Sequence, residues 1–408
     1  MTGPHHSRPR RAEHRRRLEA QRRLRRSHGV ARQGVDAMLY GLNLPNYSGL
    51  GHHDAVTAIA ERAEELGYQS LWTSDHILLP ASLPDPYGNL LESLTTLSYL
   101  AGRTRRISLA TGILVLPQRD PLLVAKQAAT IHHLSEGRLT LGVGVGWIEQ
   151  EYGYLRAAFD QRGKVADEYI AAIRALFQTD DPEYHGTWVD YSGVLFTPRP
   201  RTPLRIVVGG SSTRALRRAA TLGDGWHGLH RTPQEVRAAT AALDRYGRKP
   251  GYSVSLRTRT RMTRKDAERP DAAALIGTAD QLAAQAEQYA EAGVDQLVIE
   301  PDAAELGDFL DQITRFADHV ANRLLALSRP DIPKDLLGPL RAQHPLPDQE
   351  CLCFRHSPLQ AQLSDLDRLV LHELPGQDVD DASLTWRRRG RRGRRSVACG
   401  GPATAQRE

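Results

Sequence analysis

The sequence predicts an α/β protein whose central part folds as a TIM barrel, the (β/α)₈ arrangement. Short apolar runs alternate with helix-length amphipathic segments between residues 38 and 327, which is the pattern of parallel strands joined by helices. Eight such strand–helix pairs fit into about 290 residues, and a barrel of this type needs ~250 residues. A doubly wound sheet shows the same alternation, but the number of repeats and the single-domain length favour the barrel.

Each expected strand is a short apolar or β-branched run bounded by polar residues or glycine. The strands are expected at residues 39–45, 70–74, 107–114, 139–145, 204–208, 225–229, 253–262 and 295–299. The helices are expected at residues 54–66, 92–102, 121–134, 163–178, 213–222, 232–245, 279–291 and 303–324. Start signals support several helices, since Pro121 stands early in one and Thr278 precedes another. The long segment between the fourth and fifth strands includes EYHGTWVDYSGVLF and is expected to form an inserted hairpin over the barrel mouth.

The two ends of the chain differ from this central part in composition. The 408 residues have a net charge of +6, but residues 1–37 carry +8 and residues 387–408 carry +7, which leaves −9 for the residues between them. We expect residues 1–37 to be a disordered Arg-rich extension, with Met38 as the natural start. Residues 328–408 are expected to be a low-complexity extension. The barrel domain is therefore expected at residues 38–327.

Composition also indicates the cellular compartment and the classes of partner to expect. No stretch approaches the ~20 consecutive apolar residues of a membrane span, and no apolar segment follows the first arginines as in a signal peptide. Three cysteines, all late in the chain, exclude a disulfide scaffold and fit the reducing cytoplasm. The spacing of Cys351 and Cys353 does not match a zinc site. The N-terminal arginines lack the aromatic residues and modules of nucleic-acid binders, so a polyanion partner is only a remote alternative.

Candidate functional residues are sought at the strand ends, because barrels of this kind place their active site at the C-terminal ends of the strands. The second strand leads into Asp75 and His76, ahead of a proline-rich stretch. A carboxylate beside an imidazole can move protons near neutral pH. Asp75 could instead cap a turn and His76 could bond locally, and the residues alone favour neither interpretation.

Glycines alternate along the fourth strand, in the run LGVGVGW that ends at Trp147. Their spacing differs from the G-x-G-x-x-G of dinucleotide sites. Glycine at every second position leaves one face of the strand without side chains. This allows the close approach of a flat ring or of another backbone, or it suits a tight barrel interior that needs small residues. Both interpretations remain open. In the third strand, Gly112 between Thr111 and Ile113 indicates a bulge or an unusual backbone.

The fifth strand ends in Val208, Gly209, Gly210 and Ser211, directly before Ser212 and the next helix. Two glycines followed by hydroxyl residues at a helix start offer backbone N–H groups, hydroxyl donors and the positive end of a helix dipole. Such an arrangement is typical of phosphate binding. Plain capping of the helix by a serine is the alternative, and the double glycine favours the phosphate.

Taken together, these motifs resemble those of the bacterial luciferase-like family and, within it, the coenzyme F420-dependent oxidoreductases. The resemblance covers nearly all of residues 38–326. It rests on SLWTSDHILLP, ATGILVLPQRDPLLVAKQAATIHHLSEGRLTLGVGVGWIEQEY, VVGGSSTRALRRAATLGDGWHGL and GTADQLAAQAEQYAEAGVDQLVI, in this order. The assignment therefore does not depend on one short match.

The resemblance implies a TIM-like barrel that binds a flavin or deazaflavin at its C-terminal mouth. His76 would then be the catalytic residue facing the ring and the substrate, with Asp75 beside it contacting the cofactor. Gly112–Ile113, directly after Thr111, would form a non-proline cis peptide that backs the ring. The cofactor pocket would be lined by Val145, Gly146 and Gln150, and the cofactor phosphate would be held by Val208, Gly209, Gly210 and Ser211.

One position departs from the branch of this family that oxidises glucose-6-phosphate. In that branch a glutamate follows the glycine at the end of the fourth strand and donates a proton, whereas this chain has Trp147. No barrel lysine stands at a clear strand end. The four are Lys126, Lys164, Lys249 and Lys265. A sugar phosphate is therefore not the expected substrate, and Trp72 and Trp147 suggest a pocket with aromatic walls.

We therefore predict an F420-dependent enzyme that transfers a hydride between the deazaflavin and a small organic substrate. An FMN-dependent monooxygenase that uses dioxygen is the alternative, because both cofactors place a phosphate near the same loop. The resemblance also implies a homodimer, and neither a metal nor a membrane partner is expected.

Overall fold

The computed structural model of the chain describes residues 38–83, 87–267 and 271–321. The extensions expected at residues 1–37 and 328–408, together with the three cysteines, lie outside these described residues. Among the described helices, none has both the length and the apolar character needed to cross a membrane.

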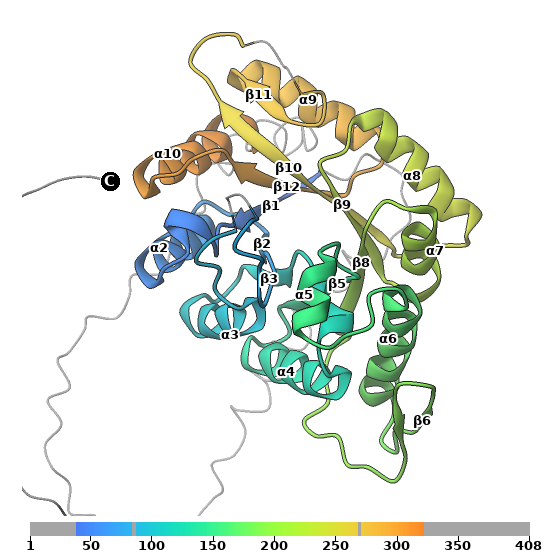
Figure 1. Cartoon of the computed structure of the whole chain (residues 1–408). Helices are drawn as coiled ribbons and strands as arrows, with labels where there is room; N and C mark the ends of the chain where they lie inside the picture. The colour runs from blue at the N-terminus through green and yellow to red at the C-terminus, as the bar shows by residue number, and fades with distance from the viewer. Residues whose placement is uncertain (1–37, 84–86, 268–270, 322–408) are drawn as a thin grey trace, which may run out of the picture. The chain divides into compact units, whose positions relative to one another are not determined.

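Eight parallel strands close into a barrel, as the sequence predicts, and Figure 1 shows them inside a ring of helices. The barrel strands are β1 (Leu39–Leu44), β2 (Ser70–Thr73), β3 (Ser108–Thr111), β5 (Leu139–Gly144), β8 (Arg205–Gly209), β9 (Gly225–Leu229), β10 (Ser253–Met262) and β12 (Gln296–Pro301). The barrel closes because β12 pairs with β1 on one side and with β10 on the other. We call the end formed by the C-termini of these strands the mouth, and the opposite end the base.

Longer helices surround the barrel at the positions expected from the sequence. They are α2 (His53–Glu65), α3 (Ser93–Arg103), α4 (Pro121–Leu134), α6 (Arg162–Gln178), α7 (Thr213–Leu222), α8 (Pro233–Arg245), α9 (Ala279–Glu291) and α10 (Leu306–Phe316). Local start signals explain several boundaries. The Asp120 side chain accepts two backbone N–H groups at the start of α4, next to Pro121, and Thr232 and Glu235 form a capping box at the start of α8.

Shorter elements modify the regular repeat. β4 (Leu114–Val115) resumes the path of β3 after two residues and pairs with β5, and α5 (Glu149–Tyr154) follows β5 at the mouth. β11 (Leu275–Gly277) pairs in parallel with the end of β10. The sequence patterns did not predict α5 or β11, because each is too short to show a clear period.

The inserted hairpin between the fourth and fifth barrel strands is present, but its expected place over the mouth was wrong. β6 (Tyr184–His185) and β7 (Asp190–Tyr191) form the hairpin, which packs beside α6 outside the barrel (Figure 1). The Glu168 carboxylate on α6 accepts the backbone N–H groups of Trp188 and Val189. The Tyr191 hydroxyl donates to a carbonyl of α6. The position follows from connectivity, because α6 ends near the base and the hairpin begins there.

The alternating glycines of β5 make room for other parts of this chain. A Cβ on Gly142 would lie 1.9 Å from the carbonyl oxygen of Thr111, and one on Gly144 would lie 2.1 Å from Cδ1 of Ile113. A Cβ on Gly209 in β8 would lie 2.9 Å from Cγ2 of Ile113. Of the two interpretations left open by the sequence, close approach within the barrel is the one that these contacts support.

This packing predicts that Gly142→Ala destabilises the fold. The added methyl group meets a backbone carbonyl, which cannot rotate away, and overpacking of this kind costs about 1–3 kcal/mol. Urea unfolding measures the change in the free energy of unfolding. Gly102→Ala is the matched control, because Gly102 lies in α3 with nothing within 4 Å of its Cβ position. The control should gain up to about 1 kcal/mol from helix propensity, and equal stability of the two variants would contradict the prediction.

Candidate functional site at the barrel mouth

His76 lies just beyond β2 at the mouth and is held by a carboxylate that the sequence analysis missed. Nδ1 of His76 is 2.9 Å from Oε2 of Glu151 on α5. The other carboxylate oxygen of Glu151 accepts the backbone N–H groups of Ile77 and Leu78, at 2.6 and 3.2 Å. The ring of His76 also makes edge contacts with the rings of Tyr87 and Trp147. The predicted catalytic histidine therefore has a fixed orientation.

Glu151 is buried yet well supplied with donors. Burial alone would raise the pKa of Glu151, but hydrogen bonds from His76 and Ile77 lower it below the ordinary glutamate value. An ionised Glu151 only accepts hydrogen bonds, so Nδ1 of His76 must carry a proton and donate it. Nε2 is then the nitrogen of His76 that Glu151 leaves available for proton transfer.

Asp75 has protein partners for both of its carboxylate oxygens. Arg119 donates to Oδ1 at 2.6 Å and to Oδ2 at 2.9 Å, and the backbone N–H of Val115 donates to Oδ2 at 2.8 Å. The side chain of Asp75 has no exposed surface. Its geometry therefore does not support the expected contact with a cofactor. Asp75 instead ties the end of β2 to β4.

Trp72 does not form a wall of a substrate pocket, which corrects the expectation from the sequence. Its side chain is buried and stacks on His227 with the ring centroids 4.3 Å apart. Its indole N–H donates to Ser70 at the first position of β2, so the ring lies in the barrel interior. Side chains alternate along a strand, and the sequence did not show which face of β2 Trp72 occupies.

His227, beside Trp72, is a buried histidine that the sequence analysis did not select. Burial lowers the pKa of His227 to about 3, so the ring is neutral at ordinary pH. Nδ1 is 2.9 Å from the hydroxyl of Ser255, while Nε2 has no hydrogen-bond partner within the described part of the chain. His227 is thus a neutral part of the barrel interior beneath the mouth.

Trp147 and the segment around it do reach the mouth. Trp147 is 59% exposed and approaches the ring of His76 edge-on at 6.4 Å, so its predicted place in a pocket wall stays open. Val145 and Gly146 are half-buried and Gln150 is exposed at the start of α5. These three are therefore accessible to a ligand, as their predicted role requires.

The bulge after β3 is present at the predicted residues. The peptide bond between Gly112 and Ile113 is cis, which confirms that prediction. Thr111 is buried, and its hydroxyl donates to the carbonyl of Gly142 at 2.6 Å. The Thr111 side chain therefore fastens the bulge to β5.

The predicted phosphate loop leads from β8 into α7 at the mouth. Val208 and Gly209 are buried in the strand, whereas Gly210, at φ +109°, and Ser211 are exposed. The hydroxyl of Ser212 caps α7 by accepting the N–H of Ala215, so the capping interpretation is also correct for that residue. A cation that the sequence analysis missed joins the loop, because Arg231 donates to the hydroxyl of Ser211 at 2.7 Å.

A basic groove continues from this loop along α7, between α7 and the first turns of α6. Its volume is about 960 Å³, and its lining includes Val145, Ser212 and Thr213. Five cationic side chains line it against two carboxylates. The cations are Arg162, Lys164, Arg214, Arg217 and Arg218, and the carboxylates are Asp160 and Asp167. Only Arg218 forms an ion pair with one of these carboxylates among the described residues, so the groove favours anions.

A second polar cluster occupies the other side of the mouth, at the ends of β1, β9, β10 and β12. Arg257 donates to both carboxylate oxygens of Glu300, at 3.0 and 2.5 Å, and also to the hydroxyls of Ser74 and Tyr47. Nε2 of His230 lies 2.8 Å from Glu300. The cluster borders a cavity of about 430 Å³. Charged residues inside apolar strand patterns were the available signal for Arg257 and Glu300.

Comparisons with known proteins agree with this fold. The family model for luciferase-like monooxygenases matches residues 37–270. An uncharacterized protein from Mycobacterium tuberculosis is 34% identical over 206 residues, covering 47% of this chain and 71% of that protein. An F420-dependent glucose-6-phosphate dehydrogenase from Amycolatopsis mediterranei is 30% identical over 175 residues, covering 41% of this chain and 50% of that enzyme.

Two solved structures show the same fold. The monooxygenase RslO1 from Streptomyces bottropensis has a TM-score of 0.61 at 21% identity, covering 70% of this chain and 99% of that one. The oxygenating constituent of 3,6-diketocamphane monooxygenase from Pseudomonas putida, in complex with FMN, has a TM-score of 0.59 at 16% identity. That match covers 70% of this chain and 98% of the other.

The ion pair between buried Arg257 and half-buried Glu300 predicts a specific pH dependence of stability. Burial would raise the pKa of Glu300, but Arg257 and His230 hold it well below the ordinary value of 4.5. A depressed carboxyl pKa stabilises the fold above the unfolded value, and this stabilisation is lost as the pH falls below about 4.5. Glu300→Gln should therefore cost about 3–5 kcal/mol at pH 7, because it leaves Arg257 buried without its carboxylate.

Urea unfolding at pH 7, 5.5, 4.5 and 3.5 measures this difference. The difference in free energy of unfolding between the wild type and Glu300→Gln should become smaller at the two lowest pH values. Glu291→Gln, an exposed position on α9, serves as the control and should leave the pH dependence unchanged. A gap that stays constant down to pH 3.5 would exclude the ionised pair as its source.

Proposed function

This chain belongs to the luciferase-like monooxygenase family, and we propose that it is a coenzyme F420-dependent oxidoreductase. It would transfer a hydride between the deazaflavin and a small organic substrate. The observation that carries this proposal is the basic groove that begins at Ser212 and Thr213, directly after the phosphate loop. The F420-dependent relative from Amycolatopsis mediterranei supports the same choice.

The donor set of the loop and groove fits an anionic cofactor with more than one negative group. The exposed Gly210 and Ser211, the start of α7 and Arg231 suit a phosphate. FMN ends at its phosphate, whereas coenzyme F420 continues into an acidic tail. The further cations Lys164, Arg214 and Arg217 would have no anionic group to bind on FMN, but they would suit the acidic tail of F420.

The remaining predicted residues define where the ring would be held. Gly112 and Ile113 would back it from the barrel side, as the resemblance implies. Val145, Gly146 and Gln150 would border it, and Val208 and Gly209 would carry the loop that holds the phosphate. When bound, the deazaflavin supplies a carbon centre that accepts or donates a hydride.

His76 is the residue that we propose to move a proton. Glu151 keeps Nδ1 protonated and fixes the ring plane, so Nε2 can accept a proton from a substrate hydroxyl or return one to it. Trp147 beside it would limit access of water. The protein's contributions are thus orientation of the reactants and one positioned acid–base group.

The cavity on the Glu300 side suits an uncharged substrate better than a sugar phosphate. Its buried cation, Arg257, is already neutralised by Glu300. Arg259 and Asp302 at the rim have opposite charges. We therefore propose a neutral organic substrate of modest size. A cytoplasmic location and a homodimer stay predictions.

An FMN-dependent monooxygenase is the second candidate. It is favoured by the structural likeness to a Pseudomonas putida monooxygenase that was solved with FMN. The same phosphate loop would hold FMN, and the outer part of the basic groove would then be left without a ligand.

Titration of the full-length protein with each cofactor distinguishes the two candidates. We expect tighter binding of F420 than of FMN, measured by fluorescence. Arg214→Glu should weaken F420 binding about tenfold or more, because it reverses one charge in the groove. Lys265→Glu reverses an exposed charge outside the groove lining and should change little. Tight FMN binding without F420 binding would overturn the proposal.

Substitution of His76 tests its proposed role. With a substrate identified by screening alcohols and ketones, His76→Asn should reduce turnover about 10²–10⁴-fold with a small change in cofactor affinity. Glu151→Gln should also slow turnover and shift its pH profile, since it removes the charge that fixes the imidazole tautomer. His133→Asn, at an exposed position on α4, is the matched control. Unchanged turnover in His76→Asn would remove His76 from the mechanism.

A further inference from the structure

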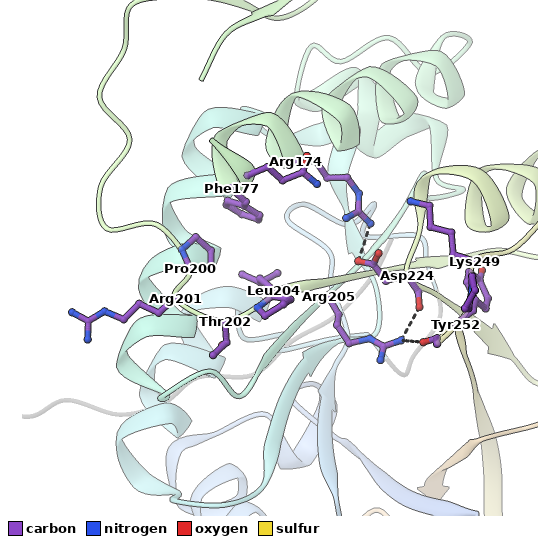
Figure 2. Close-up of a pocket in the computed structure, with 14 residues that line it drawn as sticks. Arg174, Phe177, Pro200, Arg201, Thr202, Leu204, Arg205, Asp224, Lys249 and Tyr252 are labelled. Carbon is purple, nitrogen blue, oxygen red and sulfur yellow. Dashed lines mark hydrogen bonds and ion pairs between the residues drawn. The ribbon is translucent and has the colours of Figure 1, made fainter. Parts of the chain in front are cut away.

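A cavity of about 540 Å³ opens at the base of the barrel, at the opposite end from the mouth. Its walls come from the end of α6 and from the segments that lead into β8, β9 and β10. Figure 2 shows it in close-up, with Arg174, Arg205, Asp224, Lys249 and Tyr252 around it. The volume lies within the range of small-molecule sites.

The charge of this cavity is positive. Arg174 forms an ion pair with Asp224 at 2.8 Å, which neutralises that carboxylate. Arg205 donates to the carbonyl oxygens of Asp224 and Gly251 (Figure 2), and no carboxylate forms an ion pair with it among the described residues. Lys249 has no partner of its own in the described part of the chain. Arg201 also lines the cavity, so three cationic charges remain without a carboxylate partner among the described residues.

Apolar and rigid groups complete the walls. Phe177 and Leu204 supply apolar surface, and Pro200, Pro203 and Pro250 restrict the backbone of the lining segments. The hydroxyl of Tyr252 is buried and has no hydrogen-bond partner among the described residues. Apolar surface beside cations without a carboxylate partner suits a ligand that has both an anionic and an apolar part.

We propose that this base cavity binds a small phosphorylated molecule that has an apolar or aromatic part. The phosphate would lie near Lys249 and Arg205, which provide N–H donors and positive charge. The apolar part would lie against Phe177. The site goes beyond the proposed oxidoreductase function, because it lies at the other end of the barrel from the cofactor loop.

A phosphate is favoured over a single carboxylate by the number and arrangement of the donors. Arg205 lies at the start of β8, whereas Lys249 lies in the segment that leads into β10, so the two donors reach the cavity from two separate segments. A tetrahedral phosphate has enough oxygen acceptors to use donors that do not lie in one plane, whereas a carboxylate is planar and is already satisfied by one guanidinium.

Isothermal titration of the full-length protein with phenyl phosphate tests the proposal, with inorganic phosphate and benzoate as comparison ligands. We expect saturable binding of one phenyl phosphate, weaker binding of inorganic phosphate and the weakest binding of benzoate. Lys249→Glu should weaken phenyl phosphate binding about tenfold or more. Because Lys249 is exposed and unpaired among the described residues, this variant should keep the wild-type melting temperature.

The charge reversal Arg214→Glu at the mouth separates the two anion sites. It should impair cofactor binding and leave phenyl phosphate binding intact, whereas Lys249→Glu should do the opposite. Loss of phenyl phosphate binding in Arg214→Glu, with retention in Lys249→Glu, would show that the ligand binds at the mouth and would overturn the proposal. Phe177→Leu should reduce the preference for phenyl phosphate over inorganic phosphate, and an unchanged preference would contradict the placement of the ring.

Discussion

The close approach of the β3–β4 segment to β5 is the constraint on which the mouth depends. Gly142 leaves space for the carbonyl of Thr111, and Gly144 leaves space for the side chain of Ile113. This approach sets the course of β4, whose Val115 N–H is bonded to Asp75. Asp75 immediately precedes His76, so close packing inside the barrel determines where the proposed acid–base group stands. Atoms at full packing density transmit such displacements, because no void can absorb them.

The two sides of the mouth share one electrostatic arrangement, in which a carboxylate lies against a histidine ring. A carboxylate holds a histidine on each side: the buried Glu151 holds His76, and the half-buried Glu300 holds His230. Both carboxylates are kept ionised by donors that compensate for burial, backbone N–H groups in one case and Arg257 in the other. Fixing one ring nitrogen in this way orients the ring and leaves the other nitrogen available to exchange a proton, which is what proton transfer requires.

Local charge in this protein differs from its net charge. Residues 38–386 together carry −9, yet in both hollows discussed here, the groove beside α7 and the cavity at the base, the cationic side chains of the lining outnumber the carboxylates. In a concave site with low-dielectric walls, the nearest charges dominate the potential. This is the physical basis on which we propose two separate anion sites in an acidic barrel.

The sequence by itself determined the barrel, most element bounds, the bulge at Gly112–Ile113 and the loop at Gly209–Gly210, because side-chain period and turn chemistry are local properties. Tertiary structure alone decided that Trp72 faces the interior, that the hairpin packs beside α6, and that Glu151 orients His76 from 75 residues away. The same holds for the pair of Arg257 and Glu300. Contacts of this kind form only when the barrel closes, and the period of one strand does not reveal which distant side chain will meet it.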